Sequence, residues 1–133
     1  MGYPGTVMDS SKVLRKRILL VDDQPKVRET IKMLLEFDEH LVVEAANGPE
    51  ALDQFMGEHF DLVVTDYAMP GMRGDELAKV IKQNLPSQPI LLVTGSGALS
   101  SATADHVDGV LNKPFMLEDL RRSLAEALRA SRV

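Results

Sequence analysis

The feature that most constrains the fold of this sequence is an alternation of two kinds of segment. Short, nearly uninterrupted apolar runs alternate with longer stretches in which apolar residues recur every three or four positions. Apolar runs of this kind are typical of strands buried on both faces of a parallel sheet, and the longer stretches have the period of amphipathic helices. The sequence predicts strands at residues 17–21, 41–45, 61–65, 90–93 and 109–111.

Helix signals separate these strands. Pro25 suits the first turn of a helix, Asn47-Gly48-Pro49 opens a second, and a third ends before Pro86. The last helix follows Pro114. With right-handed crossovers, this (βα)₅ order gives an α/β fold, a doubly wound five-stranded parallel sheet in a three-layer sandwich. The apolar positions predicted for the helices are Val27, Ile31, Leu34 and Leu35, then Ala51, Leu52, Phe55 and Met56, then Leu77, Val80 and Ile81, and finally Leu117, Leu120, Leu124 and Leu128.

Polar residues gather where the predicted strands end. Asp22-Asp23 ends the first strand, Asp66 the third and Thr94 the fourth, and Lys113-Pro114 follows the fifth. Doubly wound sheets bind their ligands at the carboxyl ends of the strands. We therefore expect three carboxylates, a hydroxyl and an ammonium group to converge on one edge of the sheet. Each residue alone is commonly structural, because Asp and Thr suit turns, so the prediction rests on the combination.

Crowded carboxylates repel one another unless a cation lies between them. Oxygen ligands favour Mg²⁺ or Ca²⁺ over zinc, and a few carboxylates with waters suit octahedral Mg²⁺ best. One carboxylate can also act as a nucleophile and form an aspartyl phosphate. Asp66 is the best candidate, since it lies on the central strand before a loop rich in Pro and Gly. The metal would neutralise charge on the phosphoryl group, and Lys113 and Thr94 would bind its oxygens.

Four segments resemble the receiver domains of bacterial response regulators and hybrid histidine kinases. They are Ile-Leu-Leu-Val-Asp-Asp (18–23), Asp-Leu-Val-Val-Thr-Asp-Tyr-Ala-Met-Pro-Gly-Met-Arg-Gly (61–74), Val-Thr-Gly (93–95) and Leu-Asn-Lys-Pro-Phe (111–115). The resemblance covers residues 17–130 and implies a flavodoxin-like fold. Residues 1–16 show no clear period and include several Gly, Pro and Ser residues, so they are predicted to form a flexible N-terminal leader before a receiver domain at residues 17–133.

The resemblance also implies a role in a two-component phosphorelay. The phosphoryl donor would be a phosphohistidine on a histidine kinase or a histidine phosphotransfer protein, and phosphorylation would shift a conformational equilibrium read by a downstream protein. The domain would catalyse only its own phosphorylation and dephosphorylation. The implied site consists of Asp66 as phosphoacceptor, Thr94 and Lys113 as partners of the phosphoryl group, and Asp22, Asp23, Asp66 and the Ala68 backbone carbonyl as Mg²⁺ ligands.

Three positions depart from the family pattern. Val110 stands where the family usually has Tyr or Phe, so the usual aromatic readout of phosphorylation is not expected. The stretch between Thr94 and Lys113 is a few residues shorter than is usual in the family and poor in large apolar side chains. This predicts that the fourth helix, at residues 95–106, is short, displaced or mobile. Met116 replaces the capping Ser or Asp expected before the last helix.

Composition excludes several other classes of function. A net charge of −5 argues against direct binding to nucleic acid or a membrane surface, and the absence of cysteine excludes thiol chemistry. His40, His59 and His106 lack a metal-ligand spacing and are predicted to be surface or loop residues. No apolar run approaches the roughly 20 residues of a membrane span. A cytoplasmic location is therefore expected.

Alternatives stay open at this point. The same fold could serve as a binding module that is never phosphorylated, or as a Mg²⁺-dependent phosphohydrolase. Such hydrolases typically carry Asp-x-Asp after the first strand, whereas Asp22 and Asp23 are adjacent. A dinucleotide-binding domain is disfavoured because no G-x-G-x-x-G follows the first strand. The sequence leaves open whether the domain stands alone, acts as a phosphorelay shuttle or belongs to a hybrid kinase, and whether it forms a homodimer.

Overall fold

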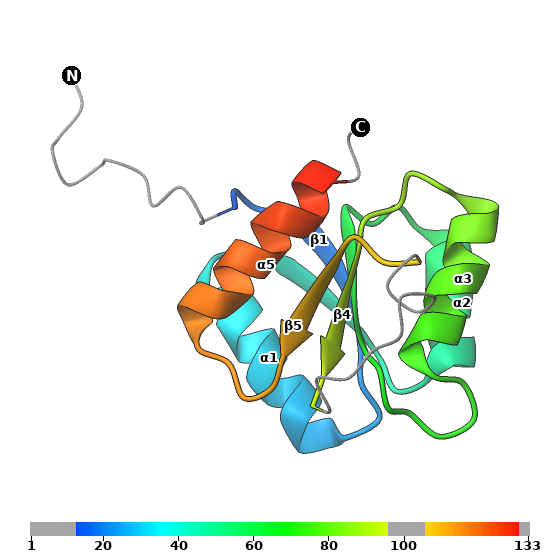
Figure 1. Cartoon of the computed structure of the whole chain (residues 1–133), viewed down its shortest axis with the longest axis horizontal. Coiled ribbons are helices and arrows are strands. Elements are labelled where there is room, and N and C mark those ends of the chain that lie inside the picture. Colours follow the sequence, from blue (N-terminus) through cyan, green and yellow to red (C-terminus); the bar gives the residue numbers. More distant parts are fainter. Residues whose placement is uncertain (1–12, 96–105, 131–133) are drawn as a thin grey trace, which may run out of the picture.

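The computed structural model describes residues 13–95 and 106–130. Within them, parallel strands form one five-stranded sheet in the order β2-β1-β3-β4-β5 (Figure 1). The predicted doubly wound parallel sheet is confirmed. The strands are β1 (Arg17–Val21), β2 (Leu41–Ala45), β3 (Leu62–Asp66), β4 (Ile90–Thr94) and β5 (Gly109–Asn112).

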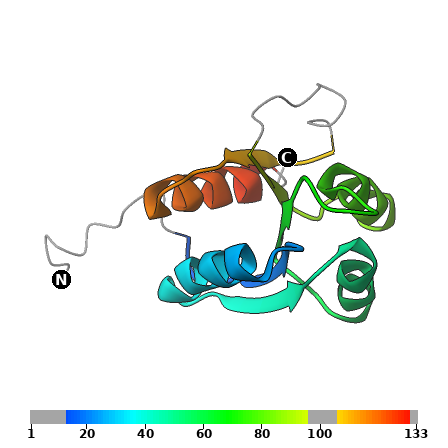
Figure 2. The same ribbon diagram turned by 90° about the horizontal axis from the view of Figure 1, so that it is seen from below.

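Four helices in the described part of the chain cover the two faces of the sheet. Figure 2 shows α1 and α5 on one side of the strands and α2 and α3 on the other. This is the three-layer arrangement that the sequence predicts. The helices are α1 (Pro25–Phe37), α2 (Gly48–Gly57), α3 (Gly74–Asn84) and α5 (Leu117–Ala130).

The third strand is shifted by one residue from its predicted range. It begins at Leu62, and the preceding Asp61 joins it to Arg17 of β1: the Asp61 N–H donates to the Arg17 carbonyl and its carboxylate accepts from the Arg17 N–H, both at 2.8 Å. It ends at Asp66, which pairs with Val93 of β4. Asp66 is therefore fixed by the sheet itself and does not belong to the loop that follows.

Strand β1 lies at the centre of two apolar cores. Ile18 and Leu20 face the core beneath α1 and α5, whereas Leu19 and Val21 face the core beneath α2 and α3. All four side chains are buried, and each such burial stabilises the fold by about 1.5–3 kcal/mol. The strand register is fixed as a result, because a slip of one residue would exchange the two sets.

At the starts of α2 and α5, the carboxylate of the third helical residue, Glu50 or Asp119, accepts a hydrogen bond from the backbone before the helix. Asn47 caps α2 by accepting from the Glu50 backbone N–H at 2.8 Å, and the Glu50 carboxylate accepts in return from the Ala46 N–H at 3.2 Å. Before α5 the carboxylate of Asp119 accepts from the Met116 N–H at 2.9 Å. Asp119 thus supplies part of the capping that the Met116 side chain cannot.

The structure adds detail on burial to two of the sequence predictions. His40 lies in the turn between α1 and β2, but it is buried, and its Nδ1 accepts from the Lys16 backbone N–H at 3.0 Å. The lead-in to β1 covers this turn, since the Leu41 N–H also donates to the Lys16 carbonyl. Met56, counted among the apolar positions of α2, is 66% exposed, and of those four positions only Ala51 and Phe55 are buried.

Most of the predicted leader and of the predicted fourth helix lies outside the residues that the structure describes. Residues 1–12 and 96–105 are not among the described residues.

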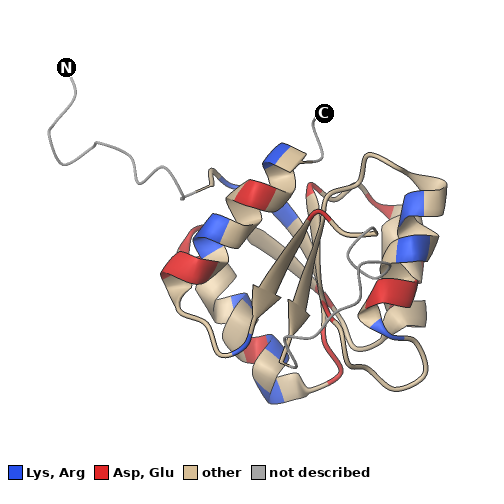
Figure 3. Cartoon of the chain, viewed as in Figure 1, with Lys and Arg blue, Asp and Glu red and all other residues tan. Residues whose placement is uncertain are grey.

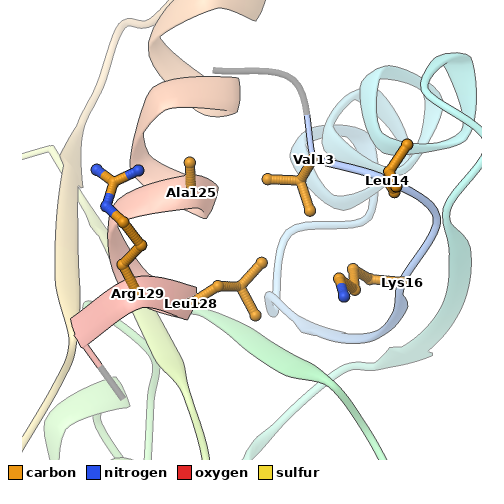
Figure 4. A pocket seen from close by; sticks show the side chains of 6 residues that line it. All are labelled: Val13, Leu14, Lys16, Ala125, Leu128 and Arg129. Atoms are coloured by element: carbon orange, nitrogen blue, oxygen red, sulfur yellow. The ribbon is translucent and has the colours of Figure 1, made fainter. Parts of the chain in front are cut away.

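Residues 13–16 run beside the carboxyl-terminal half of α5, and a groove of about 250 Å³ lies between them (Figure 4). It opens at the edge of the sheet opposite the strand carboxyl ends. Its lining residues are Val13, Leu14, Lys16, Ala125, Leu128 and Arg129.

Charged residues lie mostly on helices and connecting segments, and the middles of the strands are largely uncharged (Figure 3). Within the described residues, no helix combines the length and the apolar content needed to cross a membrane.

Candidate functional site

An acidic cluster occupies the carboxyl edge of the sheet. Asp22 and Asp23 follow β1 and Asp66 ends β3, and one carboxylate oxygen from each lies within 4.8 Å of the others. Asp22 is 1% exposed and Asp66 7% exposed. The structure therefore brings together the three carboxylates that the sequence predicted to converge.

Two oxygens of this cluster are buried without a partner. Neither Asp22 Oδ2 nor Asp23 Oδ1 has a hydrogen bond to any described residue. An unpaired buried carboxylate oxygen is costly, and such oxygens are normally satisfied by a donor or a cation. The cluster offers oxygen atoms alone, which suits a hard divalent cation such as Mg²⁺. The residues present thus fit a divalent metal.

The electrostatics of Asp22 agree with this interpretation. Burial raises the pKa of the Asp22 carboxyl, and the negative charges of Asp66 and Asp23 raise it further. The Gln24 backbone N–H, which donates to Asp22 Oδ1 at 2.9 Å, and the Lys113 ammonium act in the opposite direction. A cation bound here would favour the ionised carboxylate and reverse the net effect.

Lys113 forms an ion pair with Asp66. Its Nζ donates to Asp66 Oδ1 at 2.8 Å, and its side chain is 28% exposed. The Lys113 backbone N–H donates to the carbonyl of Thr94, the last residue of β4, and the peptide bond from Lys113 to Pro114 is cis. Thr94 is buried at the same edge of the sheet. The predicted acid, ammonium and hydroxyl groups are therefore gathered at one edge.

Glycine is required at two positions between Asp66 and the first turn of α3. Gly71 has a φ of +85°, a left-handed conformation that glycine adopts readily. At Gly74 a Cβ atom would lie 2.1 Å from the Asp66 carbonyl oxygen, so a side chain there cannot fit without displacement. Gly74 therefore positions Asp66 as well as shaping the loop. Ala68 lies in this loop with its side chain exposed, and its carbonyl as a metal ligand stays a prediction.

Sequence reasoning missed two charged residues near the acidic cluster. Arg28 of α1 donates from Nη1 to the Asp22 carbonyl at 2.7 Å and from Nε to Glu44 Oε1 of β2 at 3.1 Å. The available signal was Glu44, the single charged residue within an otherwise apolar strand. A carboxylate there needs a cationic partner from the helix that covers the strand.

An apolar groove of about 420 Å³ opens beside Lys113, between α1 and the segment that joins β5 to α5. The groove is lined by Lys26, Val27, Thr30, Ile31, Leu34, Lys113, Pro114 and Phe115.

Comparison with known proteins gives consistent matches. Residues 18–125 match the model of the response regulator receiver domain family. The chain is 36% identical over 116 residues to the response regulator MprA of Mycolicibacterium vanbaalenii, an alignment that covers 85% of this chain and 50% of the relative. The MprA of Mycobacterium avium is 34% identical over 119 residues, with 87% and 52% covered. The chain thus spans about half the length of the curated relatives it matches.

Solved structures of similar proteins share the fold. The response regulator TrrA of Thermotoga maritima, solved in complex with Mg²⁺ and BeF, is 34% identical, with a TM-score of 0.79 and coverage of 84% of this chain and 98% of that one. A receiver domain protein from Clostridium thermocellum is 30% identical, also with a TM-score of 0.79, and the match covers 87% of this chain and 96% of that one.

Replacing Asp22 by Asn is expected to raise the melting temperature in Mg²⁺-free buffer at pH 7. The substitution removes a buried charge that Asp66 and Asp23 repel, while the amide oxygen can still accept from Gln24. Because burial and the neighbouring carboxylates raise the folded-state pKa of Asp22 above its ordinary value, the wild type loses stability as the pH rises through that pKa. The advantage of the variant should therefore vanish below about pH 4. The exposed Asp53→Asn is the control, and a lower melting temperature for Asp22→Asn at pH 7 would contradict the account.

Replacing Gly74 by Ala is expected to lower the free energy of unfolding by about 1–3 kcal/mol, because the added methyl group must displace the Asp66 carbonyl. Gly57→Ala is the matched control, since a Cβ there meets nothing within 4 Å. It should be neutral or stabilise the protein by up to about 1 kcal/mol. Urea denaturation measures both, and equal effects of the two substitutions would refute the close approach.

Proposed function

The chain belongs to the response regulator receiver domain family, and on this premise we propose that Asp66 is its phosphoacceptor, acting with Mg²⁺ held at the acidic cluster. Receiver domains act in two-component signal transduction. The observation that carries the proposal is the 2.8 Å contact of Lys113 Nζ with Asp66 Oδ1 beside two further carboxylates. A nucleophilic carboxylate needs both a neutralising cation and a donor for the incoming phosphoryl oxygens, and this arrangement supplies groups for each.

The proposed step is a direct displacement at phosphorus. A carboxylate oxygen of Asp66 attacks the phosphorus of a phosphohistidine, forming a P–O bond as the P–N bond breaks. The bonding electrons pass to the imidazole nitrogen of the donor, which takes up a proton from water. Lys113 already contacts Oδ1, so we assign the attack to Oδ2. The Lys113 ammonium is then positioned to pair with a phosphoryl oxygen, and the Thr94 hydroxyl to donate to another.

Asp22, Asp23 and Asp66 are the residues that would hold the metal, together with the Ala68 carbonyl. The unpartnered oxygens of Asp22 and Asp23 support this assignment. Bound Mg²⁺ would neutralise the negative charge that gathers on the transferring phosphoryl group. The chain's own residues orient Asp66, exclude water from the buried side of Asp22 and supply the ammonium group.

The phosphodonor in this proposal is a histidine kinase or a histidine phosphotransfer protein. The groove beside Lys113 supports a protein donor, because its apolar floor gives such a partner a surface next to the phosphoacceptor. Phosphorylation adds about −1.5 to −2 charges, and the conformation that satisfies them would be recognised by a downstream protein. The domain would then be a signalling switch that acts only on its own aspartate.

Incubation with acetyl phosphate followed by intact mass measurement tests the proposal. We expect one added phosphoryl group in the wild type with Mg²⁺, none in EDTA and none in Asp66→Asn, with the exposed Asp53→Asn behaving as wild type. A phosphorylated histidine phosphotransfer protein replaces acetyl phosphate in a second arm and tests the class of donor.

Other outcomes would overturn specific parts of the proposal. A phosphoryl group retained by Asp66→Asn would mean that another residue is the acceptor. No phosphorylation from either donor would favour a binding module, and steady release of phosphate from added phosphate esters would favour a hydrolase.

A further inference from the structure

We propose that Arg28 is a positioning residue that holds the acidic turn after β1, and that Glu44 of edge strand β2 holds Arg28 in place. This inference rests on the proposed function, since it concerns the metal affinity of the same site. Arg28 spans three elements. It belongs to α1, its Nη1 donates to the Asp22 carbonyl at 2.7 Å, and its Nε donates to Glu44 Oε1 at 3.1 Å.

The hydrogen bonds of Asp22 show what Arg28 accomplishes. The Asp22 backbone N–H donates to the Ala45 carbonyl at 3.2 Å, its carbonyl accepts from Arg28, and its Oδ1 accepts from the Gln24 N–H at 2.9 Å. Of the polar atoms of Asp22, only Oδ2 has no partner among the described residues. Arg28 therefore completes a set of bonds that fixes the residue from both sides and leaves one oxygen for a cation.

A guanidinium group so close to a cation site would by itself repel the metal. Glu44 offsets part of this charge, since its two oxygens accept from Arg28 at 3.1 Å and from Lys32 at 3.1 Å, and the three side chains together keep one net positive charge. Burial raises the pKa of Glu44, but the hydrogen bonds from Lys32 and Arg28 outweigh it and the net pKa is lowered. Glu44 is therefore ionised at neutral pH. What distinguishes Arg28 from Lys32 is the geometry of the guanidinium group, a rigid fork that donates to two acceptors at once.

Lys32 provides a matched control within the same ion-pair group. It carries the same charge and contacts the same carboxylate, and its Nζ donates to Glu44 rather than to the Asp22 carbonyl that Arg28 binds. The side chain of Arg28 is 19% exposed and that of Lys32 34% exposed. Any effect of Arg28 that comes from charge alone should therefore be shared by Lys32, whereas an effect of position should not.

The test is the Mg²⁺ dissociation constant, measured by calorimetry on the full chain for the wild type, Arg28→Gln, Arg28→Lys and Lys32→Gln. Loss of a residue that orients a metal ligand typically weakens binding about 10- to 100-fold, so we expect roughly tenfold weaker binding in both Arg28 variants. Lys32→Gln should bind Mg²⁺ as tightly as the wild type or slightly more tightly. Arg28→Lys keeps the charge and loses the fork, so it separates the two causes even if Arg28→Gln folds poorly.

Phosphorylation kinetics give a second readout. The Mg²⁺ concentration for half-maximal phosphorylation by acetyl phosphate should rise in the Arg28 variants by the same factor as the dissociation constant, while the rate at saturating Mg²⁺ should stay near that of the wild type. Unchanged or tighter Mg²⁺ binding in the Arg28 variants would overturn the positioning role alone. Failure of the wild type to bind Mg²⁺ would overturn the proposed function, and this inference with it.

Discussion

Val21, the last residue of β1, pairs with Thr65 of β3, and an aspartate follows each of them in the sequence. The apolar side chains on both faces of these strands fix that register. A slip of one residue would move every side chain to the opposite face of the sheet, where it would no longer fit the core on that side. Asp22 and Asp66 are therefore forced to lie side by side at the sheet edge whatever their mutual repulsion. Burial of the core thus supplies the free energy that holds the like charges together.

The surrounding residues compensate for this repulsion without removing it. Lys113 donates to one oxygen of Asp66. Three of the four polar atoms of Asp22 are also paired: its N–H donates to the Ala45 carbonyl, its carbonyl accepts from Arg28, and its Oδ1 accepts from the Gln24 N–H. The buried oxygens left over on Asp22 and Asp23 are the part of the cluster that the described residues do not satisfy. A site that is stable yet electrostatically incomplete is suited to a reaction that brings in a cation and a phosphoryl group.

Sequence reasoning succeeded where one local pattern determined the structure. The apolar runs predicted the strands, and their order placed Asp66 and Lys113 at one edge. It failed where the outcome depended on contacts between distant segments. In the sequence, nothing distinguishes Arg28 from an ordinary exposed helix residue. Its role depends on Glu44, which the fold of β2 brings beside it. The burial of His40 likewise depends on the chain before β1. Val110 is 37% exposed on β5, and its part in signalling stays a prediction.

The central claim is that the phosphoryl group forms an acyl phosphate at one defined aspartate. Borohydride reduces an aspartyl phosphate to homoserine, so peptide mass spectrometry after phosphorylation and reduction locates the acceptor directly. The account predicts homoserine at position 66 only, and only when Mg²⁺ was present. Homoserine at position 22 or 23, or a phosphoryl group that survives borohydride on another type of residue, would contradict it.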